Sequence, residues 1–111
     1  IEDERMTRPH FPDLVRALPD IEGPIDAFRL AADKCEVLFA SYPAGTVIEP
    51  HTHATENVGV ITEGELILTK GGEVTRYGPG DWYHLDPNEE HAARFDVATS
   101  EVEFWFESHG Q

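Results

Sequence analysis

The stretch VGVITEGELILTKGGEVTRYGPGDWYHL, residues 58–85, decides the fold class. Short runs of β-branched, aromatic and other apolar residues alternate in it with turn residues, most clearly Gly71 and Gly72 and the Gly-Pro-Gly of residues 78–80. Paired glycines supply the positive φ values that a tight hairpin turn needs. The stretch therefore predicts several short strands joined by tight turns.

Similar runs lie on both sides of this stretch, at CEVLFASY (35–42), HAARFDV (91–97) and EVEFWFE (101–107). Together they give about seven or eight strands at roughly 8–12-residue spacing, with no helix between them. Such a pattern is typical of an antiparallel β-barrel or sandwich. The sequence thus indicates an all-β fold.

The segment before residue 35 has a different texture. Residues 1–10 are polar, charged and without periodicity, while FPDLVRAL (11–18) has apolar residues at helical spacing and is followed by Pro19. We therefore expect an N-terminal arm and short helix over 1–34, packed on a β-barrel formed by 35–111. At 111 residues the chain fits one domain.

The charge balance excludes several classes of partner. The chain has 22 acidic and 8 basic residues, a net charge of −14. Nucleic acid and an anionic membrane surface would repel such a chain, and no apolar run is long enough to span a membrane. The single cysteine, Cys35, cannot form an internal disulfide, and the start of the chain does not resemble a signal peptide. We expect a cytoplasmic protein.

The last strand, EVEFWFE, has two chemically different faces. Glutamates 101, 103 and 107 share one face with Trp105, whereas the other face carries Val102, Phe104 and Phe106. Because burial favours phenylalanine over glutamate, we expect the phenylalanines inside and the glutamates outside. Trp105 would then be covered by the N-terminal segment or would pack in a homodimer. We expect no acid–base pair among the carboxylates, which we place at strand ends or on outward faces.

Two of the six histidines are one residue apart. On a strand, His51 and His53 would project from the same face. An unpaired buried ring nitrogen costs about 1–3 kcal/mol, and a divalent metal removes that cost because neutral imidazole is a good ligand. Paired histidines at this spacing also occur on protein surfaces, so the pair alone does not decide between a metal site and a pair of surface residues.

The spacing around these histidines resembles the cupin superfamily. Its first motif is a glycine, five residues, His-x-His, three residues, Glu, six residues and Gly. Every interval is kept here, on Gly45, His51, His53, Asn57 and Gly64. The family's glutamate is replaced by Asn57.

The second cupin motif is a glycine, five residues, Pro-x-Gly, two residues, His, three residues and Asn. Its intervals are also kept, on Gly80, Asp86, Asn88, His91 and Phe95. Asp86, Asn88 and Phe95 replace the family's proline, glycine and asparagine. The resemblance covers about residues 35–107, and small single-domain bacterial cupins of unassigned role look most similar.

The resemblance implies a jelly-roll barrel in which His51, His53 and His91 converge on one divalent transition metal. Zinc, nickel, iron, manganese and copper are not distinguished. Asn57 would be the fourth ligand through its amide oxygen, with Glu56 as the alternative. Strand alternation points Glu56 away from His53, so Glu56 would need a bulge to reach the metal.

For function, the resemblance implies a metalloenzyme acting on a small organic molecule, by isomerisation or ring-opening or by dioxygenation. The alternatives are a non-catalytic ligand- or metal-sensing module and a degenerate barrel used for dimer formation. We expect a homodimer, a small-molecule substrate or ligand, and no nucleic-acid or membrane partner.

Other residues are secondary candidates. We expect His84 to lie in the core or to contact the metal ligands, rather than to bind the metal itself. Candidate pocket walls are Phe39, Tyr42, Phe95, Phe104 and Phe106.

Overall fold

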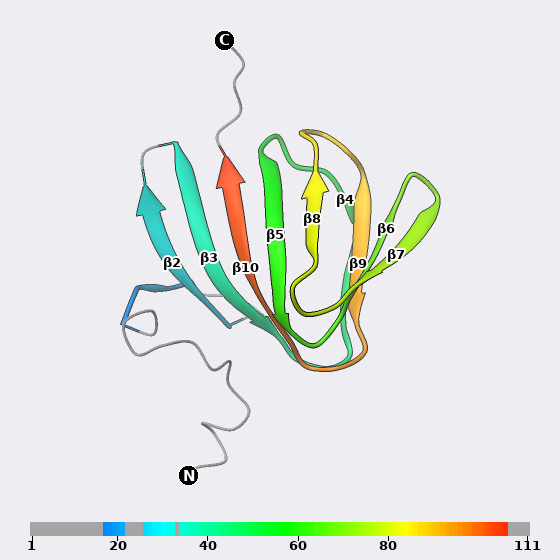
Figure 1. Ribbon diagram of the computed structural model, residues 1–111. Helices are drawn as coiled ribbons and strands as arrows, with labels where there is room; N and C mark the ends of the chain where they lie inside the picture. Colours follow the sequence, from blue (N-terminus) through cyan, green and yellow to red (C-terminus); the bar gives the residue numbers. More distant parts are fainter. Residues whose placement is uncertain (1–16, 22–25, 33, 107–111) are drawn as a thin grey trace.

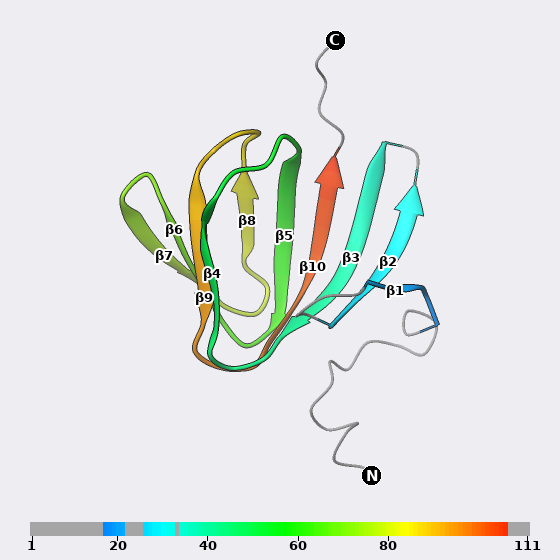
Figure 2. The same ribbon diagram turned by 180° about the vertical axis from the view of Figure 1, so that it is seen from behind.

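The computed structural model describes residues 17–21, 26–32 and 34–106, and over these ranges the chain is built from strands and turns (Figures 1 and 2). The described strands, in chain order, are β1 (Asp20–Ile21), β2 (Asp26–Ala32), β3 (Cys35–Tyr42), β4 (Thr46–His51), β5 (Glu56–Glu63), β6 (Leu66–Lys70), β7 (Glu73–Tyr77), β8 (Trp82–Leu85), β9 (His91–Phe95) and β10 (Thr99–Phe106).

The strands form two antiparallel sheets. One has six strands in the order β1-β2-β3-β10-β5-β8, and the other has four in the order β4-β9-β6-β7. Figures 1 and 2 show them as two walls of one structure, with β10 in the middle of the larger wall. Since β10 pairs with both β3 and β5, its inward side chains lie at the centre of that wall.

The core lies between the two sheets and takes side chains from both. Its main buried members are Ala27, Ala40, Tyr42, Ile61, Leu66, Leu68, Tyr83, Leu85 and Phe95.

The turns predicted from the glycines are present. Gly71 and Gly72 have φ values of 61° and 80° between β6 and β7, and Gly80 has a φ of 88° before β8. Asn88, which replaces the glycine of the second motif, adopts a left-handed φ of 64°.

The all-β, antiparallel prediction is confirmed, but the closed barrel is not. Every strand pairing in the described part of the chain stays within one of the two sheets, so backbone hydrogen bonds between strands do not join the sheets into a ring. The predicted helix over 11–18 falls mostly outside the described residues. Ala17 and Leu18, which are described, form a turn and a bend. Within the described ranges there is no helix long and apolar enough to cross a membrane.

Three described strands, β1, β2 and β4, lie in segments for which no strand was predicted. β2 pairs with β3 from Asp26↔Ser41 to Ala32↔Cys35, so the larger sheet begins before residue 35. β4 pairs with β9 and carries the first candidate ligand, His51, at its end.

The predicted orientation of β10 is wrong. Glu101 and Glu103 are 2 % and 3 % exposed, whereas Val102 and Phe104 are only partly buried on the opposite face. The physical reason is that the inner face offers hydrogen-bond donors to both carboxyl groups, which offsets part of the cost of burying them. On the outer face Phe104 stacks against Trp82 at 6.1 Å between ring centroids.

Candidate metal centre

Three histidines meet at one end of the four-stranded sheet. His51 ends β4 and is the register partner of His91, which begins β9, and His53 follows two residues after His51. The ring centroids of His51 and His91 are 4.3 Å apart, and those of His53 and His91 are 4.8 Å apart. One ring nitrogen from each histidine lies within 4.8 Å of those of the other two. The structure thus brings together the three predicted ligands.

Each of these rings is hydrogen-bonded to a backbone carbonyl two residues away in the sequence. The Nδ1 atoms of His51, His53 and His91 lie 2.9, 2.9 and 2.8 Å from the carbonyl oxygens of Glu49, Thr55 and Glu89. A carbonyl oxygen only accepts hydrogen bonds, so each Nδ1 carries the hydrogen. In a neutral ring with its hydrogen on Nδ1, Nε2 keeps a free lone pair, and metal-binding histidines commonly show this arrangement.

The burial of the three rings differs: His91 is buried, His53 is partly buried and His51 is exposed. Nε2 of His53 is the one buried side-chain nitrogen or oxygen without a hydrogen-bond partner among the described residues. Burial lowers the pKa of His91, and neighbouring His51 and His53 lower it further, against an opposing hydrogen bond to the Glu89 carbonyl. An unpartnered buried nitrogen on His53, next to a His91 ring whose pKa is lowered, fits a divalent transition metal.

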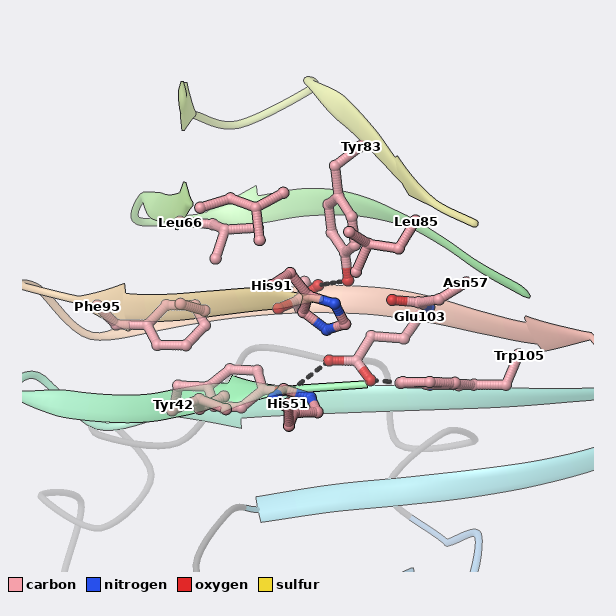
Figure 3. A pocket seen from close by; sticks show the side chains of 14 residues that line it. Tyr42, His51, Asn57, Leu66, Tyr83, Leu85, His91, Phe95, Glu103 and Trp105 are labelled. Carbon is pink, nitrogen blue, oxygen red and sulfur yellow. Dashed lines mark hydrogen bonds between the residues drawn. The ribbon is translucent and has the colours of Figure 1, made fainter. Parts of the chain in front are cut away.

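The two candidates for a fourth ligand are on different faces of β5. Asn57 is 2 % exposed and lines the cavity next to His51 and His91. Its Nδ2 donates to the carbonyl of Phe104 at 3.1 Å, and Figure 3 shows its side chain pointing toward the histidines. This hydrogen bond uses the amide nitrogen and leaves the oxygen as the atom available to a metal.

Glu56 lies away from the histidine cluster. Its Oε2 is 2.5 Å from Nε2 of His84, in a separate outward group that also contains Asp86. His84 itself is half-exposed, so the expectation of a core or supporting histidine is wrong. It lies on the outer face of β8 with Trp82, where Glu56 and Asp86 supply its polar partners.

A cavity of about 140 Å³ lies between the two sheets beside the histidines (Figure 3). The described residues that line it include no lysine and no arginine. They are Tyr42, Ile48, His51, Asn57, Leu66, Leu68, Tyr83, Leu85, His91, Ala93, Phe95, Glu101, Glu103 and Trp105. Of the predicted pocket walls, Tyr42 and Phe95 are in this lining, and Phe39, Phe104 and Phe106 are not.

Trp105 is not the exposed aromatic that parity predicted. Its indole packs edge-on against His53, with ring centroids 4.8 Å apart, and its Nε1 donates to Oε1 of Glu103 at 3.0 Å. Trp105 therefore connects the histidine cluster to the acidic wall of the cavity. Trp105 is engaged by His53 and Glu103 within the chain, so it gives no reason to expect a homodimer.

Sequence reasoning missed the two glutamates in the cavity wall. Tyr83 donates to Oε1 of Glu101 at 2.5 Å, and Tyr42 donates to Oε2 of Glu103. Burial raises the pKa of Glu101 well above its ordinary value, and the nearby Glu103 charge raises it further. Burial also raises the pKa of Glu103, although hydrogen bonds from Tyr42 and Trp105 oppose this.

The phenols are positioned by packing. Tyr42 stacks on Phe95 with ring centroids 4.2 Å apart and ring planes 7° apart. Tyr83 lies across Gly59, its register partner on β5, where an added Cβ would come within 2.4 Å of the ring. Burial, followed by the charges of the glutamates, raises the pKa of both tyrosines, so both remain hydrogen-bond donors at neutral pH.

Comparison with known proteins agrees with this architecture. The family model "Cupin domain" matches residues 38–106. An RmlC-like cupin from Shewanella frigidimarina is 18 % identical with a TM-score of 0.74, covering 93 % of this chain and 95 % of that one. KdgF from Halomonas sp. is 22 % identical with a TM-score of 0.68, covering 80 % and 86 %.

A third similar structure comes from work on the DMSP lyases RdDddP and RnDddQII. It is 16 % identical with a TM-score of 0.69, and the match covers 78 % of this chain and 50 % of that one. At these identities the solved structures show the fold alone. The family match spans more than half of the chain and includes all three histidines of the cluster, and on this evidence the chain belongs to the cupin domain family.

Proposed function

We propose that the chain binds one divalent transition metal through Nε2 of His51, His53 and His91, with the Asn57 amide oxygen as a further ligand. The observation that carries this proposal is that all three rings use Nδ1 for a backbone hydrogen bond and leave Nε2 for another partner. Each Nδ1 is occupied by a backbone carbonyl, and Nε2 of His53 is buried without a partner. A shared cation is the simplest partner for three such nitrogens.

We further propose that the site is that of an enzyme acting on a small organic molecule in the adjoining cavity. A bound divalent ion would supply Lewis-acid polarisation of a carbonyl or hydroxyl oxygen. Three neutral imidazoles and an amide bring no negative charge to such an ion, which strengthens that effect. Tyr42 and Tyr83 contribute hydroxyl groups to the cavity wall, and apolar residues make up much of the rest of it.

Isomerisation or ring-opening is favoured over dioxygenation by the buried acids. Proton transfer needs a group that accepts a proton and a group that donates one, and Glu101 and Glu103 offer both within one cavity. Dioxygenation remains the second candidate for the same three-histidine site.

Metal content tests the first part of this proposal. We expect about one ion per chain in the wild type after metal loading, as in mononuclear histidine sites, and much less in His51→Ala, His53→Ala and His91→Ala. His84→Ala is the matched control, since His84 lies outside the cluster. Undiminished metal in a His51→Ala/His91→Ala double variant would exclude the site.

Turnover separates an enzyme from the alternative, a ligand- or metal-sensing module. The metal-loaded protein is screened with hydroxyketones, uronates, diketones and thiols, with and without oxygen. Product formation independent of oxygen supports isomerisation, and product formation only with oxygen supports dioxygenation. Saturable binding without product supports the sensor. A homodimer, a cytoplasmic location and the lack of a nucleic-acid partner stay predictions from the sequence.

A further inference from the structure

Glu101 and Glu103 are the most unusual charged groups in the described structure. They lie two residues apart on the inner face of β10 and are almost completely buried. Both line the cavity, and the lining contains no lysine or arginine to neutralise them. Two carboxylates in such surroundings cannot both keep a negative charge, because each is desolvated and repels the other.

The donors around the pair indicate where the charge resides. Glu103 accepts hydrogen bonds from the Tyr42 hydroxyl and from Trp105 Nε1, whereas Glu101 has the Tyr83 hydroxyl. With two donors, Glu103 is the better stabilised anion. Burial and the Glu103 charge both raise the pKa of Glu101, which makes Glu101 the protonated member.

We propose that Glu101 and Glu103 share one proton and act as an acid–base pair on a small uncharged hydroxycarbonyl compound held in the cavity. This inference rests on the proposed metalloenzyme function and names its substrate class and proton-transfer groups. The other polar groups that face the pair are Tyr42 on β3, Asn57 on β5, Tyr83 on β8, His51 on β4, His91 on β9 and Trp105 on β10.

The cavity itself argues for an uncharged substrate. Apart from the proposed ion, an anionic molecule would meet the Glu103 carboxylate and no lysine or arginine among the described lining residues. A volume of about 140 Å³ is small compared with the roughly 300–1,000 Å³ of drug-sized sites. Much of the lining is apolar, and the tyrosine hydroxyls lie near the acids. A compound with few carbons, one carbonyl and one hydroxyl matches these features.

The step conserves protons and electrons. The Glu103 carboxylate removes a proton from the carbon next to the carbonyl group, and the C–H electron pair forms a carbon–carbon double bond. The π electrons of the carbonyl move to its oxygen, which takes the proton of Glu101 and becomes a hydroxyl. The pair has gained one proton and given one, with the charge now on Glu101. In the second half, the Glu101 carboxylate takes the proton of the neighbouring hydroxyl group, and Glu103 returns its proton to the carbon that held the carbonyl. This yields the isomer, with no oxidant or reductant.

The shared proton is tested by infrared spectroscopy at pH 7, without reference to metal or turnover. We expect the carbonyl stretch of a protonated carboxylic acid in the wild type. The band should persist in Glu73→Gln, a control on an exposed strand position, and be absent from a Glu101→Gln/Glu103→Gln double variant. Lack of the band in the wild type would overturn the shared proton.

The acid–base role is tested by deuterium exchange from heavy water into hydroxyacetone, a small uncharged hydroxyketone. We expect exchange by the metal-loaded wild type and Glu73→Gln. It should fall about 100-fold or more in Glu101→Gln and in Glu103→Gln, the usual effect of removing a general acid or base. Metal content should be unchanged in both variants. Tyr42→Phe is a second variant, and by removing a donor to Glu103 it should slow exchange with both acids present.

The outcomes are distinguishable from failure of the metal site. Exchange that persists in the Gln variants, or no exchange by the wild type, overturns the acid–base role. Loss of metal along with exchange in the Gln variants also overturns it, because the glutamates would then serve the metal. A wild type that binds no metal defeats the proposed function, while the infrared band still decides the shared proton.

Discussion

At the scale of single residues, the two buried acids in the cavity wall are unfavourable for the stability of the folded protein. Burying a carboxyl group lowers stability unless it is fully partnered, and apolar residues of similar volume would pack the same space at less cost. Proteins keep such groups where function needs them. Glu101 and Glu103 are therefore expected to reduce stability in a measurable way.

Glu101→Gln should make the protein more stable at neutral pH. The pKa of Glu101 is raised in the folded protein above its ordinary value of 4.5, so the folded state binds more protons than the unfolded state between the two pKa values. Wild-type stability thus falls as the pH rises through that window, by about 1.4 kcal/mol for each pH unit inside it. Gln keeps an oxygen for the Tyr83 hydroxyl and does not titrate.

Thermal melts of wild type and Glu101→Gln at a series of pH values check this. The melting temperature of the variant should exceed that of the wild type by an amount that grows above pH 4.5 and levels off above the folded pKa. A difference that is constant with pH would contradict the assignment. Glu73→Gln, at an exposed position, should show no such trend.

Asn57→Asp should tighten metal binding and lower the stability of the metal-free protein. The substitution adds a negative charge beside the three neutral histidines without changing the size of the side chain. It also removes the Nδ2 donor to the Phe104 carbonyl, so the metal-free variant should melt at a lower temperature. Competition with a chelator should give about tenfold or greater tightening, equivalent to about 1.4 kcal/mol. Equal affinities would show that Asn57 does not face the ion.

At the scale of elements, local signals predicted the turns and most strands, whereas the orientation of β10 needed the whole sheet. Paired glycines and an asparagine in the left-handed region mark turns by themselves, because few other residues adopt those φ values. Both faces of β10 carry aromatic residues, so alternation alone does not say which face is buried. Its place between β3 and β5, and the donors Tyr42 and Tyr83, come from strands far away in sequence.

The candidate ligands were predictable for a different reason. His51, His53 and His91 occur at motif intervals that predicted their convergence, and alternation correctly separated Asn57 from Glu56. β2 and β4 were missed because DAFRLAA and TVIEPH lack a continuous run of β-branched and aromatic residues. Both are strands because a neighbouring strand pairs with them.

Gly59→Ala should disrupt the contact between β5 and β8. The added Cβ would lie 2.4 Å from the Tyr83 ring, so the phenol must move away from Glu101. Overpacking of this kind costs about 1–3 kcal/mol, which denaturant unfolding would measure. Gly78→Ala is the control, because the nearest atom to its Cβ would be 3.9 Å away. A Gly59→Ala/Tyr83→Ala double variant should not show the two losses added together, since the clash is gone.

At the scale of the whole molecule, the two sheets contribute different chemistry to one cavity. His51 and His91 belong to the four-stranded sheet, while Asn57, Glu101 and Glu103 belong to the six-stranded sheet. No backbone ladder among the described strands runs from one sheet to the other. Side-chain packing holds the sheets together there, and Lys70 Nζ on β6 donates to the His84 carbonyl on β8 at 2.8 Å. An ion bound by the histidines and by Asn57 would link the two sheets directly.

Metal loading should therefore stabilise the entire fold rather than one loop. An ion that binds only the folded state at 100 times its dissociation constant adds about 2.7 kcal/mol to the free energy of unfolding. For a domain of about 100 residues this corresponds to a rise in melting temperature of about 10 °C. Scanning calorimetry should show one transition that moves as a whole, in the wild type and in His84→Ala. His51→Ala should show little shift, because two remaining imidazoles bind weakly. A shift of equal size in His51→Ala would place the ion elsewhere, and a second transition that does not move would show that the ion stabilises one sheet only.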